Sequence, residues 1–188
     1  MKTCCDWALK SPLEKEYHDR EWGVPLREDE KLFELLILES MQAGISWAVI
    51  LKKREGMRAA FDGFDARKIA AYDQEKLSEL LQDDRVIKNR LKLQSLPQNA
   101  RAFLEIQKEY GSFSDYIWAF VNNTPQRGDW KDITEVPAKT TLSDRISAAL
   151  KKRGFKFMGS TTVYAFLQSA GLVNDHVIYC ARHPLNNK

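Results

Sequence analysis

Apolar side chains recur at helical spacing along almost the whole chain, and no segment shows the sustained alternation of apolar and polar residues that marks a half-buried strand. This pattern predicts an all-α protein. The connection from 123 to 141 has the weakest pattern and is expected to run over the surface. The predicted helices are Asp29–Met41, Ser46–Phe61, Asp65–Tyr72, Gln74–Gln82, Ile87–Tyr110 with a bend or break near Pro97, Phe113–Asn122, Ser143–Arg153, Thr161–Ala170 and a last helix after Asp175.

The length of 188 residues is enough to bury a sizeable core, so residues 1–188 are expected to form one unit, at most divided into two helical lobes. No apolar run approaches the roughly 20 residues that span a bilayer, which excludes a membrane protein. The first twenty residues are mixed and charged, unlike a signal segment, and the cysteine count of 3 is odd. These features favour a reducing, cytoplasmic setting.

Every cysteine and histidine lies near one end of the chain or the other. His176 and Cys180 are four residues apart, so a helix would place both side chains on one face. Cys5 and His18 would complete a Cys2His2 shell of the kind that holds structural zinc with no open position. The alternative is that the cysteines are small buried hydrophobic residues that cluster by chance.

Basic residues gather in three groups, although the net charge is only +3. Near helix ends such groups commonly contact phosphates, so they predict a polyanionic partner; the alternative is that they are solvated helix faces. The groups are Lys52 to Arg54, Lys88 with Arg90 and Lys92, and Lys151 to Arg153 followed by Lys156.

Glu39 continues the apolar stripe of Leu32, Leu35 and Leu36, so its carboxylate is expected to point toward the interior. A buried carboxylate needs a cationic or hydrogen-donating partner, either an internal arginine or a ligand. Aromatic faces beside such a carboxylate would suit a flat, cationic ring. The aromatic residues early in the chain include Trp7, Tyr17, Trp22 and Trp47.

The segment from 153 to 162 joins two predicted helices through a short turn with Gly154 and Gly159. The following helix opens on hydroxyl residues, and its free backbone N–H groups are suited to a phosphate. The arrangement is typical of a helix-hairpin-helix that grips a DNA backbone without reading sequence, although other glycine-containing helical corners share the pattern.

Together these residues resemble the DNA-3-methyladenine glycosylase I family, a divergent branch of the helix-hairpin-helix DNA glycosylases. The resemblance covers essentially the whole chain. It rests on Cys5-Asp6-Trp7, Tyr17-His18-Asp19, Glu21-Trp22-Gly23-Val24-Pro25, Gln42-Ala43-Gly44-Ile45-Ser46-Trp47, Leu51-Lys52-Lys53-Arg54, Phe120-Val121-Asn122, the segment 150–157, Gly159 and Gly171-Leu172-Val173-Asn174-Asp175-His176.

The resemblance implies roles for individual residues. Glu39 would accept hydrogen bonds from an extruded base that stacks on Tyr17 and Trp47, with Trp7 and Trp22 lining the same cavity between the two lobes. Ile45, in the turn at Gly44, would be the wedge that fills the gap in the duplex. The remaining matches are zinc ligands at Cys5, His18, His176 and Cys180, and phosphate contacts at Lys156, Gly159, Ser160 and Thr161.

The implied function is hydrolysis of the N-glycosidic bond of 3-methyladenine in alkylated double-stranded DNA by a monomer. No lysine nucleophile is indicated, so the enzyme is expected to be monofunctional and to leave an abasic site. Asp175 is not counted as catalytic, since the family works without that aspartate and an N-cap role is expected. Cys4 is an extra thiol, and His183 has no assigned role.

Two other classes of function are compatible with parts of the pattern. A zinc-stabilised helical DNA-binding module without catalysis would keep the hairpin and the basic groups, but it has no use for Glu39 among tryptophans. A zinc hydrolase would need an open coordination position, which four protein ligands would close.

Overall fold

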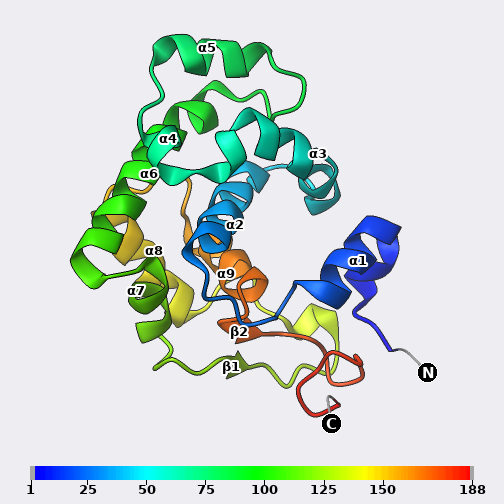
Figure 1. The fold of residues 1–188 in the computed structure, drawn as a ribbon. Helices are drawn as coiled ribbons and strands as arrows, with labels where there is room; N and C mark the ends of the chain where they lie inside the picture. Colours follow the sequence, from blue (N-terminus) through cyan, green and yellow to red (C-terminus); the bar gives the residue numbers. More distant parts are fainter. Residues whose placement is uncertain (1–2, 187–188) are drawn as a thin grey trace.

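The computed structural model describes residues 3–186 and is built almost entirely of helices (Figure 1). This confirms the prediction of a helical protein. The elements are η1 (Asp6–Lys10), α1 (Pro12–Arg20), α2 (Asp29–Gln42), α3 (Trp47–Ala60), η2 (Asp62–Phe64), α4 (Ala66–Ala70), α5 (Gln74–Gln82), α6 (Arg90–Tyr110), α7 (Phe113–Ala119), β1 (Gln126–Arg127), η3 (Ile133–Glu135), α8 (Thr141–Lys152), α9 (Ser160–Ser169) and β2 (Val173–Asn174).

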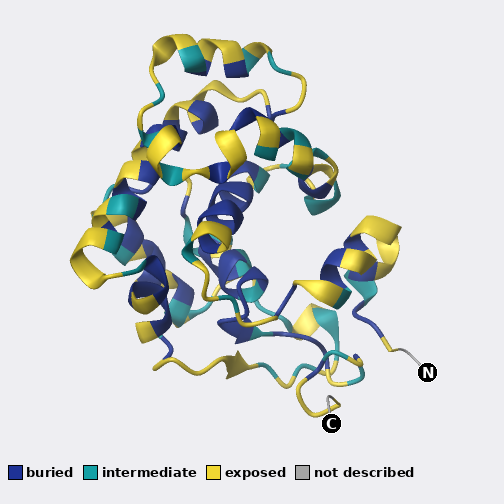
Figure 2. Cartoon of the chain, in the orientation of Figure 1, coloured by how far each residue is buried: buried dark blue, intermediate teal, exposed yellow. Residues whose placement is uncertain are grey.

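Helix α2 is the centre of the core. Its residues from Leu32 to Met41 are all buried, and it packs against α3, α6, α7 and α9. Figure 2 shows the buried residues concentrated along α2 and α9, whereas exposed residues predominate on α5. A helix that is buried on all sides can hold a polar side chain away from water, which is the property that Glu39 requires.

Helix α6 runs without a break through Pro97, where a bend or break was predicted. Proline removes one backbone hydrogen bond and crowds the preceding turn. The apolar face that includes Leu93, Leu96, Ala100 and Phe103 is buried on both sides of Pro97, so tertiary packing keeps the helix continuous.

The predicted last helix after Asp175 is wrong. Residues 175 to 186 form turns, one of which is closed by a hydrogen bond from the Cys180 N–H to the Val177 carbonyl (2.8 Å). The preceding residues Val173–Asn174 pair in parallel with Gln126–Arg127 of the long connection. Within residues 175–186 the Ile178 N–H donates to the Trp130 carbonyl (2.9 Å) and the His176 N–H donates to the Asn174 side chain (3.3 Å), so long-range and side-chain bonds replace helical ones.

Helix α1 was missing from the predicted elements because its sequence is mostly charged. Its first turn is capped by Ser11, whose side chain accepts a hydrogen bond from the Glu14 N–H, and Pro12 occupies the first helical position. The C-terminal segment crosses this region, and the Ala181 N–H donates to the Thr3 carbonyl at 2.9 Å. The two ends of the chain therefore meet beside α1 (Figure 1).

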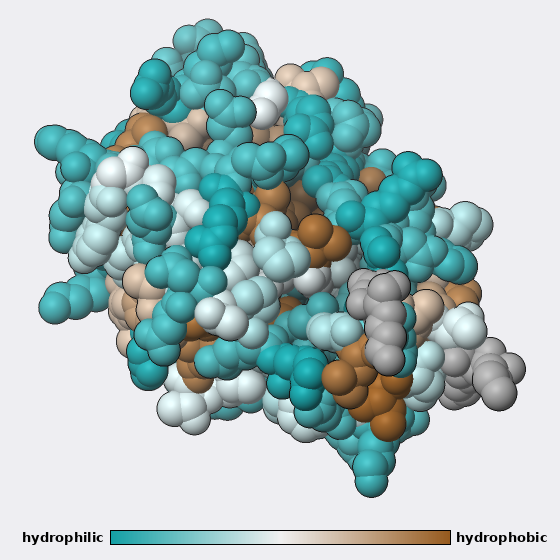
Figure 3. Space-filling view, turned by 60° about the horizontal axis from the view of Figure 1, so that its bottom comes forward, coloured by the Kyte–Doolittle hydropathy of each residue, from teal (hydrophilic) through white to brown (hydrophobic). Residues whose placement is uncertain are grey.

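The face drawn in Figure 3 is mostly hydrophilic, with apolar residues in smaller patches. Among residues 3–186, no helix has the length and apolar character needed to span a membrane.

Candidate active site and metal site

A cavity of about 380 Å³ lies among α1, α2, α3, α9 and the loop around η3. This volume is within the range of small-molecule sites. Glu39 and the four aromatic residues predicted to form a pocket all line this one cavity. Its lining residues are Trp7, Tyr17, Trp22, Glu39, Gln42, Trp47, Ile133, Val136, Pro137, Ala138, Thr161, Tyr164, Ala165, Gln168 and Ser169.

Glu39 is only 2% exposed, and its carboxylate has one protein partner. Ser169 donates its hydroxyl to Oε1 at 2.6 Å, whereas Oε2 has no hydrogen-bond partner. Burial raises the pKa of Glu39 to about 8, against a smaller lowering by the Ser169 hydrogen bond. The carboxyl group is therefore mostly protonated at neutral pH unless a cation or a hydrogen-bond donor enters the cavity.

A second buried carboxylate on α2 shows what ordinary neutralisation looks like. Glu34 accepts hydrogen bonds from Arg54 (2.7 Å) and Arg58 (2.7 and 2.9 Å), so two guanidinium groups compensate its charge. Glu39, five residues further along the same helix, has no cationic partner within the described chain. The sequence left open an internal arginine as the partner of Glu39. In the structure the arginines pair with Glu34 instead.

Three buried polar side-chain atoms lack a hydrogen-bond partner within residues 3–186, and all three belong to residues that line the cavity. They are the Tyr17 hydroxyl, Glu39 Oε2 and the Trp47 indole N–H. Burial raises the pKa of Tyr17 most, and the nearby Glu39 charge raises it further. The Ser169 hydroxyl, which is close enough to lower this pKa, donates its hydrogen bond to Glu39. Since buried polar groups are nearly always paired, this cluster indicates a polar ligand.

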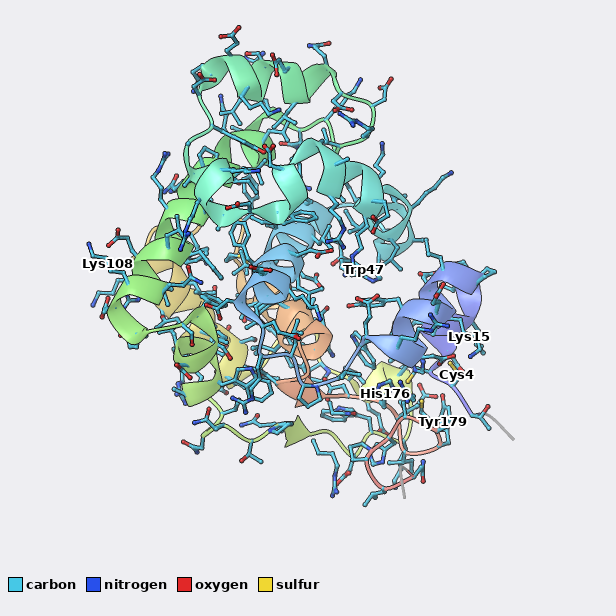
Figure 4. The ribbon with its side chains drawn as sticks, viewed as in Figure 1. Cys4, Lys15, Trp47, Lys108, His176 and Tyr179 are labelled. Carbon is cyan, nitrogen blue, oxygen red and sulfur yellow. The ribbon has the colours of Figure 1, made fainter. Side chains whose placement is uncertain are left out.

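The aromatic side chains form the walls of the cavity. Trp47 at the start of α3 lies 5.3 Å from the Tyr17 ring centroid, and Figure 4 shows it directed toward the space between α3 and α1. The Trp7 ring centroid lies 5.1 Å from that of Trp22 and 6.4 Å from that of Tyr17. Flat aromatic walls around a carboxylate favour a planar ring, above all one that carries positive charge.

The sequence did not reveal every residue of this cavity. Gln42 follows Glu39 by one helical turn and was open to detection from that spacing. Ser169 was not, because its contact with Glu39 spans 130 residues. The lining residues Ile133, Val136, Pro137 and Ala138 lie in a segment that was predicted only to be a surface connection.

A second hollow of about 390 Å³ adjoins the cavity and shares Glu39, Gln42, Thr161 and Ala165 with it. Gly44 and Ile45 line its rim. Gly44 has a φ of +77° and is exposed, which permits the sharp turn between α2 and α3. Ile45 is partly exposed and packs at the margin of the core, so its apolar side chain is partly accessible within this hollow.

The connection between α8 and α9 is fixed by side chains from other helices. The Asn99 side chain accepts from the Lys156 N–H (2.7 Å) and donates to the Lys156 carbonyl (3.2 Å). Ser147 donates to the Met158 carbonyl at 2.7 Å. Lys156 and Thr161 are exposed and Gly159 is partly exposed, but the Ser160 hydroxyl already pairs with Ser143. The turn therefore presents its backbone, the Lys156 ammonium and the exposed Phe157 ring.

Part of the predicted basic surface is turned inward, which corrects the grouping made from sequence. Lys92 is 4% exposed, its ammonium donates to the carbonyls of Met41 and Ala43 (2.9 and 2.6 Å), and burial lowers its pKa. It caps the end of α2 and is not available to phosphates. Arg54 is likewise paired with Glu34 and Glu21.

The four predicted metal ligands meet beside α1, and all are buried. The candidate ligand atoms of Cys5, His18, His176 and Cys180 lie within 4.8 Å of one another. His176 and Cys180 come from a turn, not from one face of a helix as predicted. This buried cluster has the composition and closeness of a metal site.

The residues around the cluster orient its histidines. His18 Nδ1 is 2.8 Å from Asp19 Oδ1, and His176 Nε2 is 3.0 Å from the Trp22 carbonyl, so each ring has its other nitrogen directed at the cluster. Cys4 lies 3.6 Å from the outer nitrogen of His18, at the same end of α1 as His176 (Figure 4). His183 is separate and contacts the Gly128 carbonyl.

The chain is similar to proteins of one family over nearly its whole length. The family model of methyladenine glycosylases matches residues 7–183. The chain is 48% identical over 182 residues to DNA-3-methyladenine glycosylase 1 of Escherichia coli (strain K12), with 97% of each chain covered. A crystal structure of 3-methyladenine DNA glycosylase I superimposes with a TM-score of 0.94 and 47% identity, over 97% of this chain and 100% of that one.

A more distant structure concerns recognition of the base. A structure that describes 3-methyladenine recognition by 3-methyladenine DNA glycosylase I from Staphylococcus aureus has a TM-score of 0.90 and 35% identity. It covers 98% of this chain and 96% of that chain.

Proposed function

The chain belongs to the methyladenine glycosylase family, and from this membership we propose that it excises 3-methyladenine from alkylated double-stranded DNA. It hydrolyses the N-glycosidic bond as a monofunctional, monomeric enzyme and leaves an abasic site. The observation that carries this proposal is the cavity in which three unpaired polar atoms and an uncompensated buried carboxylate stand between aromatic walls.

The reaction requires that the base first leave the duplex stack. Extrusion costs a few kcal/mol and is easier for a damaged base. Methylation at N3 makes the adenine ring cationic, so it stacks favourably on Tyr17 and Trp47 and weakens its own glycosidic bond. The bond electrons depart with the base and neutralise it, and water adds to the sugar carbon and loses a proton.

Glu39 is proposed as the residue that distinguishes the cationic base from neutral ones. In the free protein burial favours its protonated form. A positively charged, hydrogen-donating ring favours the carboxylate instead, so binding of the lesion releases a proton below about pH 8. A neutral base offers no such compensation for the desolvated charge.

The mouth of the cavity is proposed to face the duplex. Ile45, next to Gly44 on the rim, would occupy the gap left by the extruded nucleotide. The α8–α9 connection would act as a helix-hairpin-helix, in which Lys156, Gly159 and the first residues of α9, Ser160 and Thr161, hold phosphates. Residues 1–188 are proposed to form a single glycosylase unit whose two lobes share the cavity.

Zinc is the metal proposed for the Cys5, His18, His176 and Cys180 cluster. A tetrahedral zinc shell places a sulfur and a nitrogen ligand about 3.5–3.6 Å apart. The separations are 3.6 Å from Cys5 Sγ to His176 Nδ1, and 3.5 Å from Cys180 Sγ to each of the two histidine nitrogens. When bound, such an ion with four protein ligands supplies cross-linking of the two chain ends and no catalytic water.

The test is chromatographic detection of free bases released from methylated duplex DNA by the purified protein and by its Glu39→Gln variant. Release of 3-methyladenine by the wild type, reduced in the variant, is the expected result. If folded, metal-loaded wild type releases no base but still binds DNA, the glycosylase proposal is wrong and the chain is a zinc-stabilised helical DNA-binding module. Strand cleavage by the pure protein would contradict the monofunctional assignment.

A further inference from the structure

Asp175 is the best-satisfied buried carboxylate outside the set of residues assigned above. It is 1% exposed and accepts three side-chain hydrogen bonds. Oδ1 accepts from the Trp130 indole N–H (2.7 Å), and Oδ2 accepts from the Tyr164 hydroxyl (2.5 Å) and the Gln168 amide (2.8 Å). With both oxygens engaged by donors, this group is not free to act as a base.

The three donors come from the parts of the chain that form one side of the cavity. Tyr164 and Gln168 lie one turn apart on α9, and both line the cavity. Trp130 does not line it, but it begins the stretch that leads to the lining residues Ile133, Val136, Pro137 and Ala138. One buried carboxylate therefore joins the α9 wall to the opposing loop.

The packing around this contact leaves little room for adjustment. A Cβ atom at Gly128 would lie 2.0 Å from the Trp130 indole nitrogen and 2.4 Å from Asp175 Oδ1. Gly128 is also held by its own backbone, because its N–H donates to the Asn174 carbonyl at 2.9 Å. The loop is thus pressed against Asp175 at a residue with no side chain.

We propose that Asp175 is a positioning residue for the glycosylase reaction, which sets the wall of the cavity that faces Glu39 and Trp47. The inference rests on the proposed function, since it assigns Asp175 a role in the same site. The carboxylate fixes the Tyr164 ring, and it also fixes the Gln168 amide. Because one Gln168 N–H donates to Asp175, the amide carbonyl and the second N–H remain for a ligand.

The experiment compares Asp175→Asn with Asp29→Asn in the metal-loaded protein. Asp29 is a matched control because it also accepts three hydrogen bonds, from Gln107 (2.6 Å) and from the N–H groups of Phe113 and Ser114 (2.8 Å each). Asp29 does not line the cavity. The measurements are thermal stability, zinc content, and kcat and KM for release of 3-methyladenine from methylated duplex DNA.

Both variants are expected to lose stability, since each puts an amide NH2 group where a carboxylate oxygen accepts hydrogen bonds. Asp175→Asn is expected to lower kcat/KM at least about tenfold at a temperature where it is folded, because small displacements of a pocket wall misplace the base. Asp29→Asn is expected to retain wild-type kcat/KM. Zinc content should be unchanged in both, which excludes an effect through the neighbouring ligand His176.

A second variant covers the case in which Asp175→Asn does not fold. Trp130→Phe removes one donor to Asp175 and keeps an aromatic ring at a position that does not line the cavity. A reduced kcat/KM in this variant supports the proposal. If folded Asp175→Asn or Trp130→Phe has the same kcat/KM as the wild type, the positioning role is refuted, but the glycosylase function is not. If the wild-type protein itself releases no base, the proposed function is refuted.

Discussion

Replacing Glu39 by glutamine should make the protein more stable, and the gain should grow with pH. The wild-type carboxyl group has a pKa of about 8 in the folded protein, raised by burial from an ordinary value of 4.5. A carboxyl group with a raised pKa favours folding below pH 4.5 and opposes it increasingly as pH rises to 8. Glutamine cannot ionise, so the variant does not lose this stability.

The magnitude follows from the interval between the two pKa values. At about 1.4 kcal/mol per pH unit, an interval of about 3.5 units gives at most about 5 kcal/mol at pH 8 and above. For a chain of this length that corresponds to a rise in Tm of at most about 10–20 °C. At pH 5 the two proteins should differ by less than about 1 kcal/mol, because the wild-type carboxyl is then protonated when folded.

The assay is urea denaturation of both proteins at pH 5, 6, 7 and 8. Glu34→Gln is the matched control on the same helix, and it is expected to be less stable than the wild type because it leaves Arg54 and Arg58 without their buried partner. A Glu39→Gln stability gain that stays constant from pH 5 to pH 8, or a loss at pH 8, would refute the reasoning that the charge of Glu39 is desolvated and uncompensated.

Further outcomes follow for the metal, the rim and the phosphate contacts. Chelation of the metal, or the Cys180→Ser substitution, should lower Tm and change tryptophan fluorescence, because the His176 ring contacts Trp22 at 4.6 Å; an unchanged spectrum after confirmed metal loss would argue against that coupling. Ile45→Gly should slow base release from duplex DNA by about tenfold, equal to about 1.4 kcal/mol, and affect single-stranded DNA less; equal losses on both substrates in rate assays would exclude a wedge. Lys156→Ala should reduce the slope of log K against log salt for DNA binding by about 1, and an unchanged slope in fluorescence anisotropy titrations would remove Lys156 from the phosphate contacts.

Local patterns predicted the helices well where apolar periodicity and caps agreed. Helix α5 begins and ends at the predicted residues, and the Asp73 side chain caps it by accepting from the Lys76 N–H. The patterns failed where tertiary contacts decided the outcome. The segment after Asp175 is held by long-range backbone bonds, such as those from the Ile178 N–H to the Trp130 carbonyl and from the Ala181 N–H to the Thr3 carbonyl. The packed face of α6 keeps that helix unbroken through Pro97, where the sequence predicted a bend or a break.

The candidate site divides in the same way. Glu39 was detectable because a carboxylate on an apolar stripe is conspicuous within a few residues of sequence. Its partner Ser169 and the Asp175 hydrogen bonds were not, since they join positions that only the fold brings together, 130 residues apart for Glu39 and Ser169 and 45 for Trp130 and Asp175. Lys92 looked like a surface cation because its two carbonyl acceptors, from Met41 and Ala43, lie about fifty residues earlier.

An atomic structure of the protein with 3-methyladenine in its protonated, cationic form would test the central claim most directly. The account predicts the base in the cavity between the aromatic walls, with Glu39 Oε2 at about 2.6–3.2 Å from a ring donor and with the Tyr17 hydroxyl or the Trp47 indole N–H engaged. A base bound elsewhere, or one in the cavity that leaves Glu39 Oε2 without a partner, would contradict it.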